Sequence, residues 1–167
     1  MAMPTSPRLG MPFLAAGQAQ KELTHNKALA LIDAALNASA ESAGVDVPPA
    51  LPSRGQCWVV GATPTGAWAG QAGTLACWTD GGWRFVSPVK GMRVWVEDQQ
   101  LFAMWTVDGW TFGETSIARL VVDGQQVVGP RQPGVPVPDG GSTIDLEARA
   151  AIGAIVARLA AHGLIDA

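Results

Sequence analysis

The pattern of apolar and polar positions predicts a helix near the start of the chain. Residues 17–43 are rich in Ala, Leu, Lys, Glu and Gln, and neither glycine nor proline interrupts them after the first position. One stripe of this helix would consist of His25, Leu29, Ile32 and Leu36, which follow one another at helical spacing. Gly44 and the two prolines that come after it mark the end of the helix. We expect the stripe to form part of an interface between subunits.

Short strand-like runs fill the region after this helix. An extended, proline-containing connector at residues 45–54 leads to runs at 56–60, 74–79, 83–87, 93–97, 101–106 and 109–112. Because residues alternate between the two faces of a strand, Trp105 lies on the face opposite Phe102. The Asp-Gly dipeptides that start at Asp80 and Asp108 favour tight hairpins. The region therefore predicts one meandering antiparallel sheet of about six short strands, thin enough to need cover from the helix or from neighbouring subunits.

Two of these hairpins are copies of one sequence unit. Residues 78–85 read WTDGGWRF, and 27 positions later residues 105–112 read WTVDGWTF. The same offset places Trp68 on Trp95 and Cys77 on Met104. A repeated hairpin with aromatic flanks favours a structural or binding module over an enzyme.

The last third of the chain predicts a hairpin, an arm and a second helix. An Asp-Gly pair at positions 123 and 124 lies between β-branched residues and predicts a tight hairpin over residues 120–128. Four prolines then keep the chain extended and without a backbone partner as far as residue 141. The helix is expected from about residue 143 to residue 162, with Ser142 or Thr143 as its N-cap and Gly163 as a left-handed C-cap.

The second helix carries an apolar seam and no domain of its own to cover it. Ala148, Ile152, Ile155 and Leu159 step by four, three and four residues, which is the spacing of a coiled-coil seam. We expect Ile152, Ile155 and Leu159 to pack against copies of the same chain.

These elements together predict an α+β fold. It would comprise an N-terminal helix, a small antiparallel β-meander of repeated Trp hairpins, an extended Pro-rich arm and a C-terminal helix. The expected divisions are an anchoring helix in residues 1–44, a Trp-rich β domain in 45–118, the hairpin and Pro-rich arm in 119–141, and the C-terminal helix in 142–167.

Composition favours a component of an assembly. Charged residues make up 15% of the chain, below the ~25% usual for soluble domains, and glycine (20) and proline (12) are plentiful. A surface with so little charge is often covered by other subunits. A net charge of −3 with 11 scattered basic residues argues against a nucleic-acid partner. No apolar run approaches the ~18 residues of a membrane helix, and residues 1–10 do not have the pattern of a secretory signal.

The two cysteines could form a pair in principle. Cys77 aligns with Met104 in the second copy of the repeat, which favours an apolar packing role over a disulfide. We therefore expect Cys57 and Cys77 to be reduced and buried.

The chain offers few groups for catalysis. His25 and His162 have no cysteine or carboxylate at the spacing of metal ligands, so neither a metal nor another cofactor is expected. No nucleophile or phosphate-binding motif occurs in a plausible context. Asp80 and Asp108, at equivalent repeat positions, could form the carboxylate pair of a glycosidase, but the backbone of a hairpin turn already explains an aspartate there. We expect no enzymatic activity and no catalytic residue.

The tryptophans are the only rich source of surface chemistry. Indole faces can stack on the C–H faces of sugars, and Trp68 and Trp95 are the two we expect to be exposed for glycan contact. The alternative is that the aromatic residues hold the sheet together, with Trp83/Phe85 and Trp105/Trp110 as cross-strand pairs.

Residues 11–29, MPFLAAGQAQKELTHNKAL, resemble the opening signature of an uncharacterised family from alphaproteobacterial prophages and gene transfer agents. In that family the GQAQK and THN elements precede a Trp-rich β region, a pattern that covers roughly residues 9–112 here. Residues 121–133 and the helix after them are similar to the ending of several members. Lys27 departs from the pattern, which has an acidic residue at this position.

The resemblance implies a structural protein of virion fibres or spikes and supplies no catalytic residue. We therefore expect a non-enzymatic subunit of a phage-like particle, in a spike or tail fibre that helps host attachment, assembled in the bacterial cytoplasm as a homo-oligomer, a trimer. Its partners would be itself and other capsid, tail or fibre proteins, with neither nucleic acid nor membrane insertion. The alternatives are a module that binds host capsule or surface polysaccharide through exposed tryptophans and, less favoured, a polysaccharide hydrolase.

Overall fold

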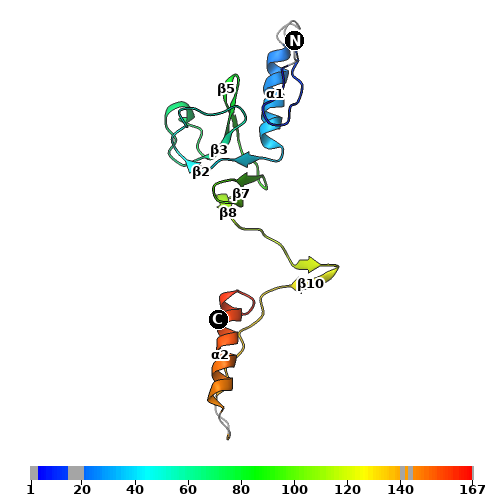
Figure 1. Ribbon diagram of the computed structural model, residues 1–167, viewed down its shortest axis with the longest axis vertical. Coiled ribbons are helices and arrows are strands. Elements are labelled where there is room, and N and C mark those ends of the chain that lie inside the picture. The colour runs from blue at the N-terminus through cyan, green and yellow to red at the C-terminus, as the bar shows by residue number, and fades with distance from the viewer. Residues whose placement is uncertain (1–3, 15–20, 140–141, 143–144, 167) are drawn as a thin grey trace. The chain divides into compact units, whose positions relative to one another are not determined.

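The computed structural model describes residues 4–14, 21–139, 142 and 145–166, and divides the chain into two units. We call Met1–Glu114 the N-terminal unit and Thr115–Ala167 the C-terminal unit (Figure 1). Two helices and mostly antiparallel strands in small sheets confirm the α+β class.

The elements of the N-terminal unit follow the sequence patterns closely. They are α1 (Lys21–Ala35), β1 (Ser39–Ala40), β2 (Ala43–Val45), β3 (Cys57–Val60), the 3-10 helix η1 (Gly66–Trp68), β4 (Leu75–Thr79), β5 (Gly82–Val86), β6 (Arg93–Val96), β7 (Leu101–Thr106) and β8 (Gly109–Phe112). The six expected strands correspond to β3–β8, and their ends agree to within a residue.

These strands form two four-stranded sheets with the same topology, so the prediction of a single meandering sheet is wrong. One sheet has the order β2-β3-β4-β5 and the other β1-β6-β7-β8. Each sheet contains three consecutive antiparallel strands and, at one edge, a short strand that runs parallel to the first of them. The parallel pairs are β2 with β3 and β1 with β6. Both parallel strands come from residues 39–45, which the sequence pattern assigned largely to the first helix.

The first helix ends at Ala35, well before residue 43. Asn37 adopts a left-handed backbone conformation (φ 47°), which stops the helical path. The guanidinium group of Arg8 then binds the carbonyl oxygens exposed at the end of the helix, those of Asp33, Ala34, Leu36 and Asn37. A residue far away in the sequence therefore caps α1. The expected start of the helix at residues 17–20 lies outside the described residues.

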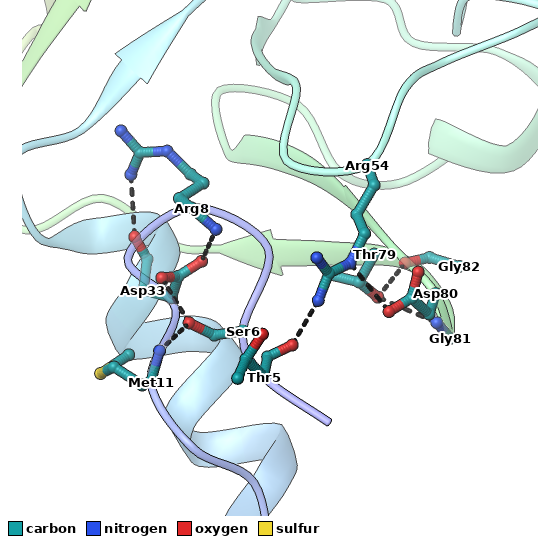
Figure 2. A network of polar contacts seen from close by, with 10 residues as sticks. All are labelled: Thr5, Ser6, Arg8, Met11, Asp33, Arg54, Thr79, Asp80, Gly81 and Gly82. Carbon is teal, nitrogen blue, oxygen red and sulfur yellow. Dashed lines mark hydrogen bonds and ion pairs between the residues drawn. The ribbon is translucent and has the colours of Figure 1, made fainter. Parts of the chain in front are cut away.

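The segment before α1 is held to the helix by a buried carboxylate. Asp33 accepts hydrogen bonds from the hydroxyl of Ser6 (2.7 Å) and from the backbone N–H groups of Arg8 (2.9 Å) and Leu9 (2.6 Å). Figure 2 shows Asp33 reaching from the helix to Ser6 and Arg8. Close by, Arg54 forms an ion pair with Asp80 at 2.8 Å and donates to the carbonyl oxygen of Thr5.

Two core clusters lie on opposite faces of β3 and β4, as the alternation of strand residues requires. The first joins these strands to the end of α1, β1 and β6 and contains Ala34, Ala38, Ala40, Cys57, Val59, Leu75, Cys77 and Val94. The second contains Trp58, Val60, Trp68 and Ala76, with Trp83 and Phe85 packed against it.

Cys57 and Cys77 form a disulfide, so the expectation of free thiols is wrong, although both residues are buried as expected. The register of β3 and β4 places the two cysteines directly opposite each other, with Cα atoms 4.1 Å apart. The neighbouring pair is hydrogen-bonded, because Trp78 N–H donates to the Gln56 carbonyl. The cysteines therefore occupy a non-hydrogen-bonded site, where the two backbones approach most closely. Only the strand register reveals this pairing.

The C-terminal unit contains β9 (Leu120–Val122), β10 (Gln125–Val128) and α2 (Leu146–Ala161). The hairpin is confirmed, and Asp123 (φ 48°) and Gly124 (φ 76°) form the tight turn that an Asp-Gly pair favours. The N-cap of α2 is Asp145, whose carboxylate accepts from Ala148 N–H at 2.8 Å, and not Ser142 or Thr143. Thr143 lies outside the described residues. Gly163 is left-handed (φ 71°), as predicted for the C-cap.

The proline arm runs along α2 and has partners at both ends. Near the end of the helix, Gln132 exchanges backbone hydrogen bonds with Leu164 and Asp166. Near its start, Arg149 donates to the carbonyl oxygen of Pro138 at 3.3 Å. The arm and the helix are thus antiparallel, and the prediction of a partner-free arm is wrong at these two points.

Candidate functional site

The two copies of the repeat fold alike at their turns. Thr79 Oγ donates to the carbonyl of Gly82 at 2.7 Å, and Thr106 Oγ donates to that of Gly109 at 2.9 Å. Both glycines are left-handed (φ 86° and 115°), a conformation that other residues rarely adopt. Asp108 is not equivalent to Asp80. The register pairs Thr79 with Gly82 in the first hairpin and Thr106 with Gly109 in the second, so Val107 is the residue that aligns with Asp80. The two aspartates of the suggested carboxylate pair therefore occupy different positions in the repeat.

Trp68 does not offer a face to a ligand, and its expected exposure is wrong. Its side chain is 0% exposed and packs between Trp58 (6.2 Å between ring centroids) and Trp83 (5.1 Å). It belongs to η1, in the long connection between β3 and β4 that has no counterpart between β6 and β7. The true counterpart of Trp95 is Val59, because Val59 pairs with Leu75 as Trp95 pairs with Phe102. The 27-residue offset thus holds only within the hairpins.

Trp95 is half-buried and lies beside an exposed aromatic ring. Its centroid is 5.0 Å from that of Phe102, at an interplanar angle of 69°, and Phe102 is 49% exposed. This pair leaves part of the predicted glycan-contact surface accessible on β6 and β7.

The other aromatic pairs hold the hairpins together. Trp105 and Trp110 pair across β7 and β8 as predicted, with centroids 5.3 Å apart. In the first hairpin the cross-strand pair is Trp78/Trp83, 5.0 Å apart, and not Trp83/Phe85, which lie on one strand. Trp110 also donates its indole N–H to the Gly73 carbonyl at 2.8 Å, which ties the second hairpin to a loop of the first sheet.

The predicted stripe on α1 faces away from the sheets. His25, Ile32 and Leu36 are exposed and Leu29 is half-buried. The buried side of the helix consists of Ala30, Asp33 and Ala34, and α1 packs beside β4 and β5 (Figure 1). The stripe is therefore largely exposed among the described residues of the N-terminal unit.

The C-terminal unit exposes most of its large apolar side chains. Among its described residues, Ile165 is the only buried hydrophobic one, and no residue of α2 is buried. The expected seam is open, with Ile152 41% and Ile155 58% exposed and Leu159 half-buried. The exposed large apolar residues of the hairpin are Leu120, Val121, Val122, Val127 and Val128.

The arm leaves a hollow against the side of α2 that adjoins the seam. It has a volume of about 580 Å³ and is lined by Val135, Pro136 and Val137 of the arm and by Val156, Ala157 and Ala160 of the helix. The arm thus covers this side of α2 loosely, and the seam of Ile152 and Ile155 lies outside it.

A groove lies between α1 and the edge strand β5, and the sequence patterns did not identify it. It has a volume of about 320 Å³ and is lined by Lys27, Leu31, Trp83, Arg84 and Phe85. We call it the α1–β5 groove. Lys27 and Arg84 also line a neighbouring cleft of about 160 Å³ that reaches Asn26 and Asp80. The one feature of the sequence that pointed to this groove was Lys27, which stands where the similar prophage family has an acidic residue.

The described part of the signature segment has a structural role. Asn26 accepts from Leu14 N–H at 2.9 Å and donates to the Leu14 carbonyl at 3.0 Å, so that its amide holds the preceding segment to α1. His25 Nδ1 lies 2.9 Å from the Lys21 carbonyl, within the same helix. Among the described residues, no three His, Cys, Asp or Glu side chains group as metal ligands, and no helix is long and apolar enough to cross a membrane.

Comparison with known proteins gives one family. Residues 25–111, which are 87 of the 167 residues, match the family model described as "Protein of unknown function (DUF2793)". The matched region begins in α1 and ends in β8, so it contains both sheets. No curated protein matches the chain.

Proposed function

We propose that this chain, which belongs to the DUF2793 family of proteins of unknown function, is a non-enzymatic structural subunit of a phage-like particle. It would form part of a spike or tail fibre in a prophage-encoded particle or gene transfer agent and help it attach to the host. It would act as a homo-oligomer, a trimer, joined to other capsid, tail or fibre proteins.

The observation that carries this proposal is the exposure of the C-terminal unit. A monomeric soluble protein rarely leaves many large apolar residues together on its surface, because their burial is the main source of folding free energy. Here the hairpin, the arm and α2 expose such residues, and only Ile165 among the described hydrophobic residues of the unit is buried. Association with copies of the same chain would remove Ile152 and Ile155 from water and cover both faces of the β9–β10 hairpin.

The N-terminal unit supports an anchoring role. The segment that resembles the prophage and gene-transfer-agent signature contributes Asn26 and the segment bound to it, which together fix the start of the chain on α1. The outer stripe with Ile32 (46% exposed) and Leu36 (51% exposed) remains available for a neighbouring subunit. In the proposed trimer the stripes of three chains would meet around a threefold axis, so that identical contacts close the assembly.

Light scattering coupled to size-exclusion chromatography tests the assembly. The full chain is expected to elute with three times the mass of one chain. Replacing Ile152, Ile155 and Leu159 together with serine should lower the mass, because these side chains would no longer exclude water from the interface. A monomeric wild-type chain would contradict the proposal.

A matched control separates the seam from exposed apolar residues in general. Leu51 (94% exposed) and Val107 (84% exposed) lie in the N-terminal unit, outside the proposed interfaces. Leu51→Ser and Val107→Ser should leave the mass unchanged. Electron microscopy of particles with and without this gene product would then test its place in a spike or fibre.

A second candidate function is recognition of a host polysaccharide. The observation that favours it is the accessible pair of Trp95 and Phe102, whose rings could stack on a sugar. Affinity electrophoresis of the wild-type chain and of Trp95→Ala in host capsule should show retardation of the wild type only. A loss of polymer size on incubation would instead favour a polysaccharide hydrolase.

A further inference from the structure

We infer that the cleft beside the β4–β5 turn binds the side chain of a glutamate in a partner polypeptide. We call it the turn cleft, and its volume is about 160 Å³. Three segments line it: the chain before α1 contributes Pro7 and Phe13, the helix contributes Leu23 and Lys27, and β5 contributes Arg84. The inference rests on the proposed function only in taking the partner to be another protein of the particle.

The turn cleft contains two cations without a carboxylate partner. Lys27 is exposed, and no carboxylate among the described residues forms an ion pair with it or with Arg84. Asp80 also lines the cleft, but its charge is compensated by Arg54 at 2.8 Å. Uncompensated positive charge of this kind favours an anionic ligand, because a charge-assisted hydrogen bond is stronger than a neutral one.

The hairpin directs Arg84 into this cleft. Arg84 pairs with Cys77 across β4 and β5, so its side chain leaves the sheet on the side of the first core cluster and the end of α1. Its Nη1 donates to the carbonyl oxygens of Gly81 (3.0 Å) and Trp83 (2.9 Å). A Cβ added at Gly81 would lie only 2.7 Å from Nη2, so the guanidinium rests against the turn where a side chain is missing.

Hydrogen bonds fix the walls of the turn cleft to one another. The amide of Asn26 accepts from the N–H of Leu14 and donates to its carbonyl, which holds the chain before α1 to the helix. Arg54 joins the same part of the chain to the turn, because it contacts the Thr5 carbonyl and the Asp80 carboxylate (Figure 2). A site that is formed before the ligand arrives loses less conformational entropy on binding.

The other polar groups of the cleft are already used, which disfavours an acidic sugar. The Asn26 amide is occupied as described, and the hydroxyl of Thr79 donates to the Gly82 carbonyl at 2.7 Å and accepts from the Gly81 N–H at 3.2 Å. Few partners remain for the hydroxyl groups of a sugar, and a polar group buried without a partner costs free energy.

The apolar wall distinguishes a glutamate from a free phosphate. Pro7, Phe13, Leu23 and Ala30 line the cleft, and phosphate would leave them without a partner. A glutamate side chain can pack its two methylene groups on this wall while its carboxylate reaches the cations. The volume of about 160 Å³ is below the ~300–1,000 Å³ typical of small-ligand sites, so the cleft suits one side chain of a longer partner.

Isothermal titration calorimetry of the full chain with a blocked peptide of alternating glutamate and alanine tests this inference. The same peptide with glutamine in place of glutamate is the neutral control, because it keeps the stem and removes the charge. We expect the glutamate peptide to bind at least about tenfold more tightly, as the loss of a charge-assisted hydrogen bond implies. Equal affinities, or no binding of either peptide, would overturn the inference.

A charge variant locates the site. Lys27→Gln should weaken binding of the glutamate peptide roughly tenfold without lowering the thermal midpoint, because Lys27 forms no ion pair with a described residue. Lys90→Gln removes another exposed charge, lies outside the cleft, and should bind as the wild type does. The same loss in Lys90→Gln would indicate only general attraction between charges and sink the idea.

A glycine variant tests the position of Arg84 without removing its charge. Gly81→Ala should weaken peptide binding, because the added methyl group displaces the guanidinium from the turn. The backbone of Gly81 is not left-handed, and the aligned position of the second hairpin holds Asp108, so alanine fits the turn itself. Wild-type affinity in both Lys27→Gln and Gly81→Ala would place the peptide elsewhere and overturn the inference.

Inorganic phosphate and oligogalacturonate distinguish a glutamate from other anions. Both should bind more weakly than the glutamate peptide, and Leu23→Ser should weaken the peptide but not phosphate, since only the peptide uses the apolar wall. Phosphate that binds as tightly as the peptide would show a plain anion site, and tighter binding of oligogalacturonate would show a sugar site. Either result would overturn the assignment.

Light scattering on the same samples keeps this inference apart from the proposed function. The turn cleft lies within the N-terminal unit, so a monomer that binds the glutamate peptide contradicts only the assembly. A trimer that does not distinguish the glutamate peptide from the glutamine peptide contradicts only the cleft.

Discussion

The hydroxyl of Ser6 donates a hydrogen bond of 2.7 Å to the carboxylate of Asp33, and both residues are buried (Figure 2). The same carboxylate accepts from two backbone N–H groups of the segment that follows Ser6. One side chain on α1 therefore satisfies three donors of a segment that has little regular structure of its own.

Replacement of Asp33 by alanine should destabilise the N-terminal unit by about 3 kcal/mol, because buried donors would lose their acceptor. Urea denaturation followed by tryptophan fluorescence measures this change. Asp98→Ala removes an exposed carboxylate and should have an effect within about 0.5 kcal/mol. Similar stabilities for Asp33→Ala and Asp98→Ala would show that Asp33 does not hold the segment.

The Cys57–Cys77 disulfide should stabilise the chain by about 3 kcal/mol, because a cross-link over 20 residues restricts the unfolded state. Urea denaturation of the double variant Cys57→Ala/Cys77→Ala compares it with the oxidised wild type. Alkylation under denaturing conditions, followed by mass spectrometry, should modify both cysteines only after reduction. Modification without a reductant would show free thiols and contradict the pairing.

The hydrogen bond from Trp110 to Gly73 should be visible as a difference between two similar substitutions. Trp110→Phe keeps an aromatic ring but loses the indole N–H, and should cost about 1 kcal/mol more than Trp105→Phe. Trp105 is the matched control, because it is the other member of the same ring pair and its indole N–H makes no described hydrogen bond. Thermal denaturation compares the two, and equal midpoints would contradict a specific role for this bond.

The left-handed glycines of the repeat should resist substitution equally in both copies. Gly82→Ala and Gly109→Ala should each cost about 1–2 kcal/mol, because an added Cβ disfavours this backbone conformation even though there is space for it. Gly153 lies in α2 with a helical backbone and open space, so Gly153→Ala should stabilise its helix by up to about 1 kcal/mol. Circular dichroism on heating would measure both the destabilisation by the two turn substitutions and the stabilisation by Gly153→Ala. A stabilising Gly82→Ala would refute the turn geometry.

Part of the candidate site could be predicted from the sequence. The open seam of α2 follows from the spacing of Ile152, Ile155 and Leu159 and from the prolines before it, since both are local patterns. The α1–β5 groove could not be predicted, because Lys27 and Arg84 come from separate elements that meet only when the helix packs on β5. The burial of Trp68 was equally hidden, because it depends on how the long connection after β3 folds over the aromatic cluster.

The sequence by itself determined the hairpins and the fold class, because alternating side chains, left-handed glycines and Asp-Gly turns act over a few residues. The tertiary structure decided which strands share a sheet. β1 and β2 are too short to carry a periodic signal, and they exist because β6 and β3 offer them hydrogen-bond partners. The same holds for Cys57 with Cys77 and for Ser6 with Asp33, since only packing between distant segments brings each pair within bonding distance.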